Sequence, residues 1–281
     1  MRRIALLSTA LAGLSLAAHK PIAITNELVS SVEDGPSAGT GYEFIQGEAV
    51  YVKFRLADYA RAKDADDKES IRLGWKVEAF DSAGVPLVEP KSESVNLELA
   101  KQDKEWSPVV RHEFLLPILL DPGQYRIVIT AYDLVHTSDA RKELSFRVRG
   151  RAVEKSDTLV VRNFRFLRSE EDGTALSPAA YRPGESVWAR FEMTGYKMGE
   201  KNSYDVAYGL EVFRADGKSM YSEPNAAHQQ ETSFYRHRYA PGVLNLNLQP
   251  DIAKGAYTVL LKVRDESGKQ EFESRHTFTV E

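Results

Sequence analysis

The sequence predicts an all-β protein made of two tandem antiparallel β-sandwiches that arose by internal duplication. Two segments of the first half return in order in the second half: 47–54 returns as 184–191, and 123–128 returns as 255–260. The offset between the copies is far longer than a solenoid repeat of roughly 20–50 residues, so whole domains are duplicated. Apolar and polar residues alternate along short segments separated by turn residues, and no amphipathic helical stripe is found.

The first seventeen residues predict a secretory signal peptide. A basic start, Met1-Arg2-Arg3, precedes an apolar run at 4–16, and small residues at Ser15 and Ala17 favour cleavage after Ala17. The apolar run is shorter than the about 20 residues of a membrane span, so we expect no stable membrane insertion after cleavage. The chain has no cysteine, which excludes disulfides and a lipid-modified cysteine. These features favour a bacterial exported protein, periplasmic or secreted.

The first copy, residues 18–150, is expected to hold eight strands, at 22–29, 49–56, 71–81, 86–89, 94–99, 109–116, 123–132 and 142–150. The second copy, residues 151–281, repeats the alternation at 187–193, 257–263 and 276–280. Glycines at Gly84 and Gly217 end matching four-residue turns, where a positive φ is often needed. Trp75 and Trp188 fall within strand patterns and are expected in the cores.

Each copy also carries the pattern of a tyrosine corner. Gly123 and Tyr125 follow an apolar residue and a tight turn, and Gly255 and Tyr257 repeat the arrangement. In such a corner the phenol bonds back to the backbone, so these four residues are expected to be structural. In this respect the chain resembles immunoglobulin-like and fibronectin type III sandwiches, and the proline-glycine-tyrosine repeats of exported bacterial modular proteins. The resemblance implies an architecture of two tandem immunoglobulin-like domains and no particular activity.

Composition and motifs exclude several functional classes. Removing residues 1–17 leaves 35 basic against 41 acidic residues, which does not suit a nucleic-acid binder. The letters Gly-x-Ser-x-Gly occur once, at 35–39, but no helix is expected after them, so they do not predict a nucleophile elbow. The sequence has no Ser-x-x-Lys pair, no His-Glu-x-x-His helix and no glycine-rich phosphate loop. We therefore expect no catalysis and no cofactor.

The candidate metal ligands in this sequence are its histidines and one acidic run. The histidines are scattered, so no element offers a pair of zinc ligands. The acidic run Asp64–Glu69 could suit calcium, but its spacing departs from an EF-hand and basic residues are interleaved with the acids. A solvated loop is the better interpretation, and the sequence leaves calcium binding open.

Two places stand out as candidate binding residues. The segment 233–239 contains Tyr235, Arg236, His237, Arg238 and Tyr239. Aromatic faces can stack on sugars and guanidinium groups can bind carboxylates, although a strand with one face in the core would give the same alternation. Trp106 lies in a polar loop without a counterpart in the second copy and could anchor a partner.

Three functional hypotheses follow from this sequence. The first is a non-catalytic protein-interaction or scaffold module of the bacterial cell envelope, because sandwiches present edge strands to which a partner can add a strand. The second is a carbohydrate-binding protein that uses the exposed aromatics, and the third is a hydrolase with carboxylates at the domain junction. The sequence names neither the partner nor the oligomeric state.

Overall fold

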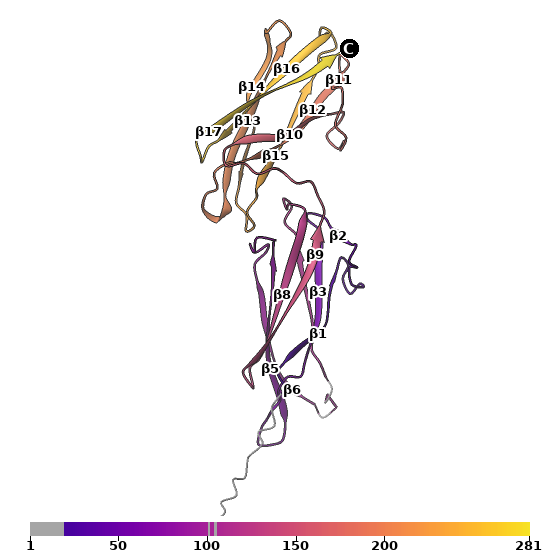
Figure 1. Cartoon of the computed structure of the whole chain (residues 1–281), viewed down its shortest axis with the longest axis vertical. Coiled ribbons are helices and arrows are strands. Elements are labelled where there is room, and N and C mark those ends of the chain that lie inside the picture. The colour runs from indigo at the N-terminus through magenta and orange to yellow at the C-terminus, as the bar shows by residue number, and fades with distance from the viewer. Residues whose placement is uncertain (1–19, 101, 104–105) are drawn as a thin grey trace, which may run out of the picture.

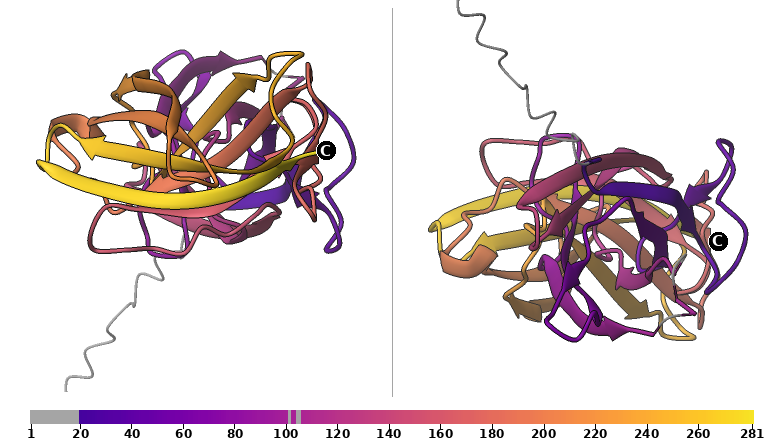
Figure 2. Two further views of the ribbon diagram at one scale, coloured as in Figure 1. Left: turned by 90° about the horizontal axis from the view of Figure 1, so that it is seen from above. Right: turned by 90° about the horizontal axis from the view of Figure 1, so that it is seen from below.

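The computed structural model describes residues 20–100, 102–103 and 106–281, and the expected signal peptide lies outside the described residues. Two β-sandwiches lie end to end along the long axis of the molecule, with the C-terminal one tilted on the N-terminal one (Figure 1). Views along that axis show the two stacked over each other (Figure 2). The described residues contain strands and one short 3₁₀-helix, Glu200–Asn202. None of their helices is long and apolar enough to span a membrane.

The N-terminal sandwich is built from nine strands. These are β1 (Ala23–Ser30), β2 (Glu43–Phe44), β3 (Ala49–Ala57), β4 (Ala62–Lys63), β5 (Glu69–Phe80), β6 (Lys91–Leu99), β7 (Val109–Leu115), β8 (Gly123–Asp133) and β9 (Ser138–Val148). The small sheet has the order β1-β3-β7, and the large sheet has the order β2-β9-β8-β5-β4, with β6 also paired to β5. All pairs are antiparallel except the short β2–β9 pair.

The C-terminal sandwich repeats this plan. Its strands are β10 (Val160–Leu167), β11 (Ala180–Tyr181), β12 (Ser186–Thr194), β13 (Tyr204–Arg214), β14 (Ser219–Glu231), β15 (Tyr239–Asn247), β16 (Gly255–Asp265) and β17 (Gln270–Val280). The small sheet is β10-β12-β15 and the large one is β11-β17-β16-β13-β14. The segment 149–159 joins β9 to β10.

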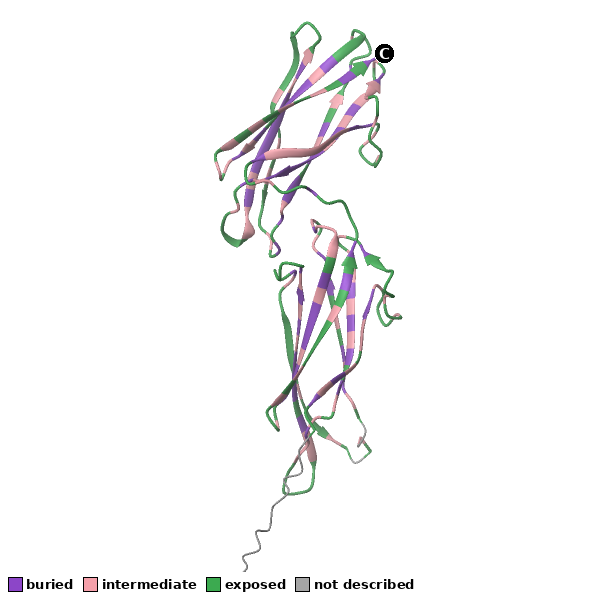
Figure 3. Cartoon of the chain, viewed as in Figure 1, coloured by how far each residue is buried: buried purple, intermediate pink, exposed green. Residues whose placement is uncertain are grey.

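Alternation along the strands places one face of each sheet in a core. On β3, Val50, Val52, Phe54 and Leu56 are almost wholly buried, while the residues between them are more exposed. The same alternation colours the strands of both sandwiches in Figure 3. Because a fully buried side chain of this kind stabilises the fold by about 1.5–3 kcal/mol, the two apolar clusters are the main source of stability.

The duplication extends to irregular backbone positions. Asn26 in β1 and Asn163 in β10 both have φ of 51°, and both lie where the strand register shifts. Asparagine tolerates this left-handed conformation better than most residues. The two strands are therefore bent by the same bulge, which sequence similarity between them does not reveal.

Some sequence predictions need correction. Residues 86–89 do not form a strand, because only an isolated bridge joins Phe80 and Pro86. The segment 233–238 is a loop between β14 and β15, not a strand. Trp75 is buried as expected, but Trp188 is partly exposed, because it alternates with the core residues Val187 and Ala189 and so faces outward.

Candidate functional site

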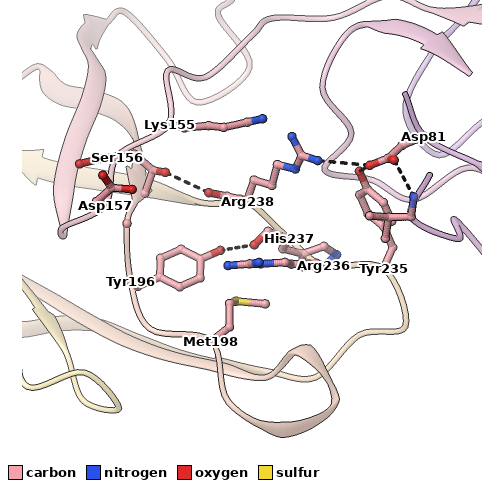
Figure 4. A pocket seen from close by; sticks show the side chains of 13 residues that line it. Asp81, Lys155, Ser156, Asp157, Tyr196, Met198, Tyr235, Arg236, His237 and Arg238 are labelled. Atoms are coloured by element: carbon pink, nitrogen blue, oxygen red, sulfur yellow. Dashed lines mark hydrogen bonds and ion pairs between the residues drawn. The ribbon is translucent and has the colours of Figure 1, made fainter. Parts of the chain in front are cut away.

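The joint between the sandwiches centres on the guanidinium of Arg238. Its Nη2 lies 3.2 Å from Asp81 Oδ2 and its Nη1 lies 3.2 Å from Asp121 Oδ2. The hydroxyl of Tyr235 donates to the same Asp81 oxygen at 3.1 Å. Figure 4 shows Arg238 and Tyr235 converging on this carboxylate. One arginine of the C-terminal sandwich thus clamps two carboxylates of the N-terminal sandwich.

The turn that follows β5 fixes the position of Asp81. The second carboxylate oxygen, Oδ1, accepts the backbone N–H groups of Ala83 and Val85 at 2.9 and 2.8 Å. Gly84 completes the turn with φ of 82°, a conformation that favours glycine. Asp81 is only 3% exposed, so its charge would be unfavourable there without these donors and the arginine.

The two carboxylates that bind Arg238 occur only in the first copy. Arg214 occupies the position of Asp81 in the second copy, and Ala253 occupies that of Asp121. The far end of the C-terminal sandwich therefore lacks both carboxylates. These two carboxylates therefore distinguish the joint from the equivalent end of the second copy.

Aromatic burial completes the joint. Tyr235 is part of the apolar cluster of the N-terminal sandwich although the chain places it in the C-terminal half. The hydroxyl of Tyr196 donates to the His237 carbonyl at 2.9 Å, and Gln46 Nε2 donates to the Tyr239 hydroxyl at 3.5 Å. Tyr235, His237 and Tyr239 are 4, 7 and 8% exposed. Their rings therefore offer no face on which a sugar could stack.

Burial also governs protonation at the joint. It raises the pKa of Tyr196 and of Tyr235 well above the usual range, because the phenolate would be desolvated. Burial lowers the pKa of His237, a change that the nearby Glu231 partly opposes. The tyrosines are thus neutral at physiological pH, which suits hydrogen bonding rather than nucleophilic attack.

A cavity of about 480 Å³ lies beside the clamp. It is lined by the linker, by the segment after β12 and by the 235–238 loop, together with Asp81 and Val85. Lys155 enters from the linker, and Arg236 lies beside Tyr196 (Figure 4). Asp157 contributes a carboxylate, so the lining carries both signs of charge.

The predicted residues separate into two places. The structure brings Tyr235, Arg236, His237, Arg238 and Tyr239 together at the joint. Trp106 lies at the opposite end of β7, where its carbonyl accepts the Tyr59 hydroxyl, and it is 37% exposed. Sequence reasoning missed Asp81 and Asp121, since only contact across the joint reveals their roles.

The four structural residues form two equivalent corners. Tyr125 donates to the Asp121 carbonyl at 2.5 Å, and Tyr257 donates to the Ala253 carbonyl at 2.6 Å. Burial, with a further contribution from Asp121, raises the pKa of Tyr125 to about 12. Gly123 and Gly255 begin β8 and β16, two residues before each tyrosine. Tyr125 thus fixes the backbone at Asp121, whose side chain holds Arg238.

The acidic run Asp64–Glu69 makes local contacts. Asp64 Oδ1 accepts the backbone N–H groups of Asp66 and Lys68, each at 2.9 Å. Glu69 pairs with Arg61 at 3.0 Å and with Lys63 at 3.6 Å. Within the described residues, no group of three or more histidine, aspartate or glutamate side chains is arranged to hold a metal ion.

Comparisons with known proteins yield distant structural likenesses. No protein-family model and no curated protein matches the chain. The C-terminal domain of the antigen I/II-family protein AspA of Streptococcus pyogenes matches at 10% identity over 93% of this chain and 99% of that one, with a TM-score of 0.32. The C-terminal domain of the Streptococcus agalactiae AgI/II polypeptide BspA matches at 10% identity over 92% of this chain and 99% of that one, with a TM-score of 0.27.

A family 123 glycoside hydrolase from Clostridium perfringens also shares part of the architecture. It matches at 12% identity over 44% of this chain, with a TM-score of 0.30, and this chain covers 27% of its length. No functional inference follows from likenesses at this level. The established statement is that the chain is an all-β protein of sandwich architecture.

Proposed function

We propose that this chain is an exported, non-catalytic interaction module of the bacterial cell envelope, which binds an extended segment of a partner protein along β6. The observation that carries the proposal is the open edge of β6. This strand pairs with β5 from Glu69↔Leu99 to Val77↔Lys91 without a register shift, and β5 is its one partner strand in the described sheets. Such an edge can accept a further strand through main-chain hydrogen bonds.

Most other edge strands carry features that discourage strand addition, and β7 offers a shorter edge of seven residues. β14 contains Pro224 and two register shifts, and β15 contains Pro241. β1 and β10 each contain a bulge. β6 has nine residues, none of them proline, and seven of these are exposed. It is therefore the longest uninterrupted edge among the described sheets, and Leu97, 45% exposed, adds an apolar contact beside it.

The carboxylates at the junction support a structural rather than a hydrolytic role. A glycosidase needs two carboxyl groups free to act on a bond between them. Asp81 and Asp121 instead share the guanidinium of Arg238, and Asp81 also accepts the Tyr235 hydroxyl. We therefore assign these acids to holding the two sandwiches together. Trp106, at the other end of β7, stays a proposed contact for the same partner.

The test combines proline substitution with site-specific cross-linking. Neighbouring residues of an antiparallel strand direct their N–H groups to opposite edges. Of the two variants Ser94→Pro and Val95→Pro, one therefore removes an N–H group from the open edge, and the other removes a hydrogen bond to β5. A photoreactive residue at Asn96 reports strand addition in the envelope of the producing cell. We expect one dominant protein to be cross-linked, and that cross-link to be lost in the proline variant that keeps its unfolding midpoint.

The matched control is β14. Tyr221→Pro and Ser222→Pro form the equivalent pair there, at two positions paired with β13 in regular register, and neither should change cross-linking from Asn96. The proposal fails if the stable β6 variant cross-links as the parent chain does, or if β14 variants abolish the product equally.

A further inference from the structure

The outer face of the small C-terminal sheet carries an unusual group of arginines. Along β12, Val187, Ala189, Phe191 and Met193 enter the core, so the alternate residues face outward. Arg190 is one of these outward residues, and Arg165 of β10 lies directly opposite it in the register. Like charges in directly opposite positions destabilise a sheet. Packing therefore does not account for this pair.

Only part of this charge is neutralised within the protein. Arg165 pairs with Glu192 at 3.1 Å, and Arg162 pairs with the exposed Glu154 at 3.3 Å. Among the described residues, Arg190 has no hydrogen bond or ion pair, and its buried Nε has no acceptor. Arg162 Nε and Glu192 Oε2 also lack a hydrogen bond, so three of the five such buried atoms described lie in this cluster. The cluster has one guanidinium more than it has carboxylates.

The N-terminal sandwich shows how the same position looks when it is satisfied. Lys53 corresponds to Arg190 in the duplication, and it lies opposite another cation, Arg111. The carboxylate of Asp34 lies between them, 2.7 Å from Lys53 Nζ and 2.9 Å from Arg111 Nε. Hydrogen bonds from Lys53 and then Arg111 lower the pKa of Asp34. The first copy thus supplies its own carboxylate at the outer face of this sheet.

An aromatic side chain precedes the cation in both copies. Trp188 stands two residues before Arg190, as Tyr51 does before Lys53, and both rings face outward. Trp188 is partly exposed, and no other described ring contacts it. Asn245 of β15 lies directly opposite Trp188, and Asn247 lies opposite Ser186. An indole face beside amides and a guanidinium about 7 Å along the strand suits a ring with hydroxyls and a carboxylate.

We infer that the outer face of the β10-β12-β15 sheet is a binding site for a carboxylated sugar, such as a hexuronate unit of an acidic polysaccharide. Arg190, helped by Arg165, binds the carboxylate. Trp188 stacks on the pyranose ring, and Asn245 hydrogen-bonds to its hydroxyls. An acidic peptide shares the carboxylate chemistry. It would usually also need main-chain partners or apolar pockets for its side chains, whereas amides flank the indole here.

In the experiment, the mature full chain is titrated at low ionic strength with tetramers of galacturonate, mannuronate and glucuronate. Isothermal titration calorimetry measures the affinity for each tetramer. Two probes separate the contributions: the methyl ester of each uronate tetramer keeps the rings without the charge, and a tetraglutamate peptide keeps the charge without the rings. We expect at least one uronate tetramer to bind, with affinity falling as salt rises. Its methyl ester and the peptide should bind at least about tenfold more weakly, the effect of one charge-assisted contact.

Variants locate the site. Arg190→Gln and Trp188→Ala should each reduce affinity at least about tenfold. Arg214→Gln removes the same charge from an exposed turn elsewhere and should change nothing. Arg190→Gln should keep or raise the unfolding midpoint, because it removes one of two opposed cations. The inference is overturned if no uronate binds, if the ester binds equally well, if the peptide binds more tightly, or if Arg214→Gln weakens binding as much as Arg190→Gln.

Discussion

At the scale of single residues, burial and not charge pairing determines the pKa of His276, which lies at the rim of the C-terminal core. The rings of His276 and Phe164 stack with centroids 3.5 Å apart and planes 7° from parallel. Burial lowers the pKa of His276 below its usual value of about 6.5. Burial lowers the pKa of His112 and His237 in the same way. All three side chains are therefore more readily protonated in the unfolded chain than in the native protein.

The pH dependence of stability follows from this direction. Above about pH 6.5 both states are neutral at these histidines and their contribution to stability is complete. As the pH falls through the depressed native pKa values, the unfolded chain binds more protons and that contribution is lost. We expect stability to decline between pH 7.5 and 5. His276→Phe keeps the ring stack and should make the decline smaller in the C-terminal sandwich.

Amide hydrogen exchange followed by mass spectrometry checks this prediction, because it reports opening free energies for each sandwich separately. The N-terminal sandwich of the same variant is the internal control and should keep its pH dependence. An unchanged pH dependence in both sandwiches would contradict the assignment of His276 as a buried neutral group.

At the scale of elements, a buried aspartate closes the hairpin of each large sheet. Asp265 ends β16, and its Oδ1 accepts the N–H groups of Ser267 and Gly268 at 3.1 and 2.8 Å. Its Oδ2 accepts the N–H of Lys197, from the segment after β12, at 2.8 Å. Asp133 does the same in the first copy, with Val135, His136 and Ala60 as donors. Each carboxylate ties a hairpin of one sheet to a loop leaving the other.

Asp265→Asn tests this tie. The asparagine amide keeps one oxygen that can accept hydrogen bonds. Its NH₂ group replaces the second carboxylate oxygen and would face N–H donors that this oxygen satisfies in the native protein. We expect a loss of about 2–4 kcal/mol in the free energy of unfolding of the C-terminal sandwich, measured by urea denaturation. Asp133→Asn should act equally on the N-terminal sandwich, and Asp216→Asn, on an exposed turn, should change stability by less than about 0.5 kcal/mol. A loss no larger than that of the Asp216 variant would contradict the role.

Elements were predictable from sequence where local pattern decides them. Strict alternation located β3, β8 and most other strands of the first copy, and the glycine-tyrosine spacing located both corners. The strand expected at 86–89 failed because its apolar residues pack as an irregular segment after β5. The alternating residue types of 233–238 were compatible with a strand, but this segment is a loop. Tyr235 is buried there because it packs against the other sandwich, not because it lies on the inner face of a sheet. Trp188 looked like core because alternation alone does not say which face is inside.

At the scale of the whole molecule, the relative placement of the sandwiches depends on contacts between residues far apart in the chain. Arg238 and Asp81 are separated by 157 positions and Tyr235 and Asp81 by 154. No local pattern in a single sequence predicts such a pair. Local signals such as alternation and turns describe each domain by itself, whereas complementary groups on two surfaces determine the joint. This is why the aromatic-rich segment could be noticed from sequence and its partner carboxylates could not.

The joint makes the last prediction. Arg238→Gln leaves Asp81, 3% exposed, without its cation. Breaking a buried ion pair costs about 3–5 kcal/mol, less here because the arginine side chain is 25% exposed. The simplest relief is for the sandwiches to part, which returns Asp81 to water without unfolding either domain. We expect small-angle scattering to show a broader range of interdomain distances and proteases to cut faster within 149–159.

Two further variants are the controls. Arg236→Gln, at an exposed neighbouring residue, should change neither measurement. Asp81→Asn combined with Arg238→Gln should restore much of the arrangement in which the two sandwiches are in contact. Identical scattering and cleavage in Arg238→Gln and the parent chain would show that aromatic packing by Tyr235 alone holds the joint.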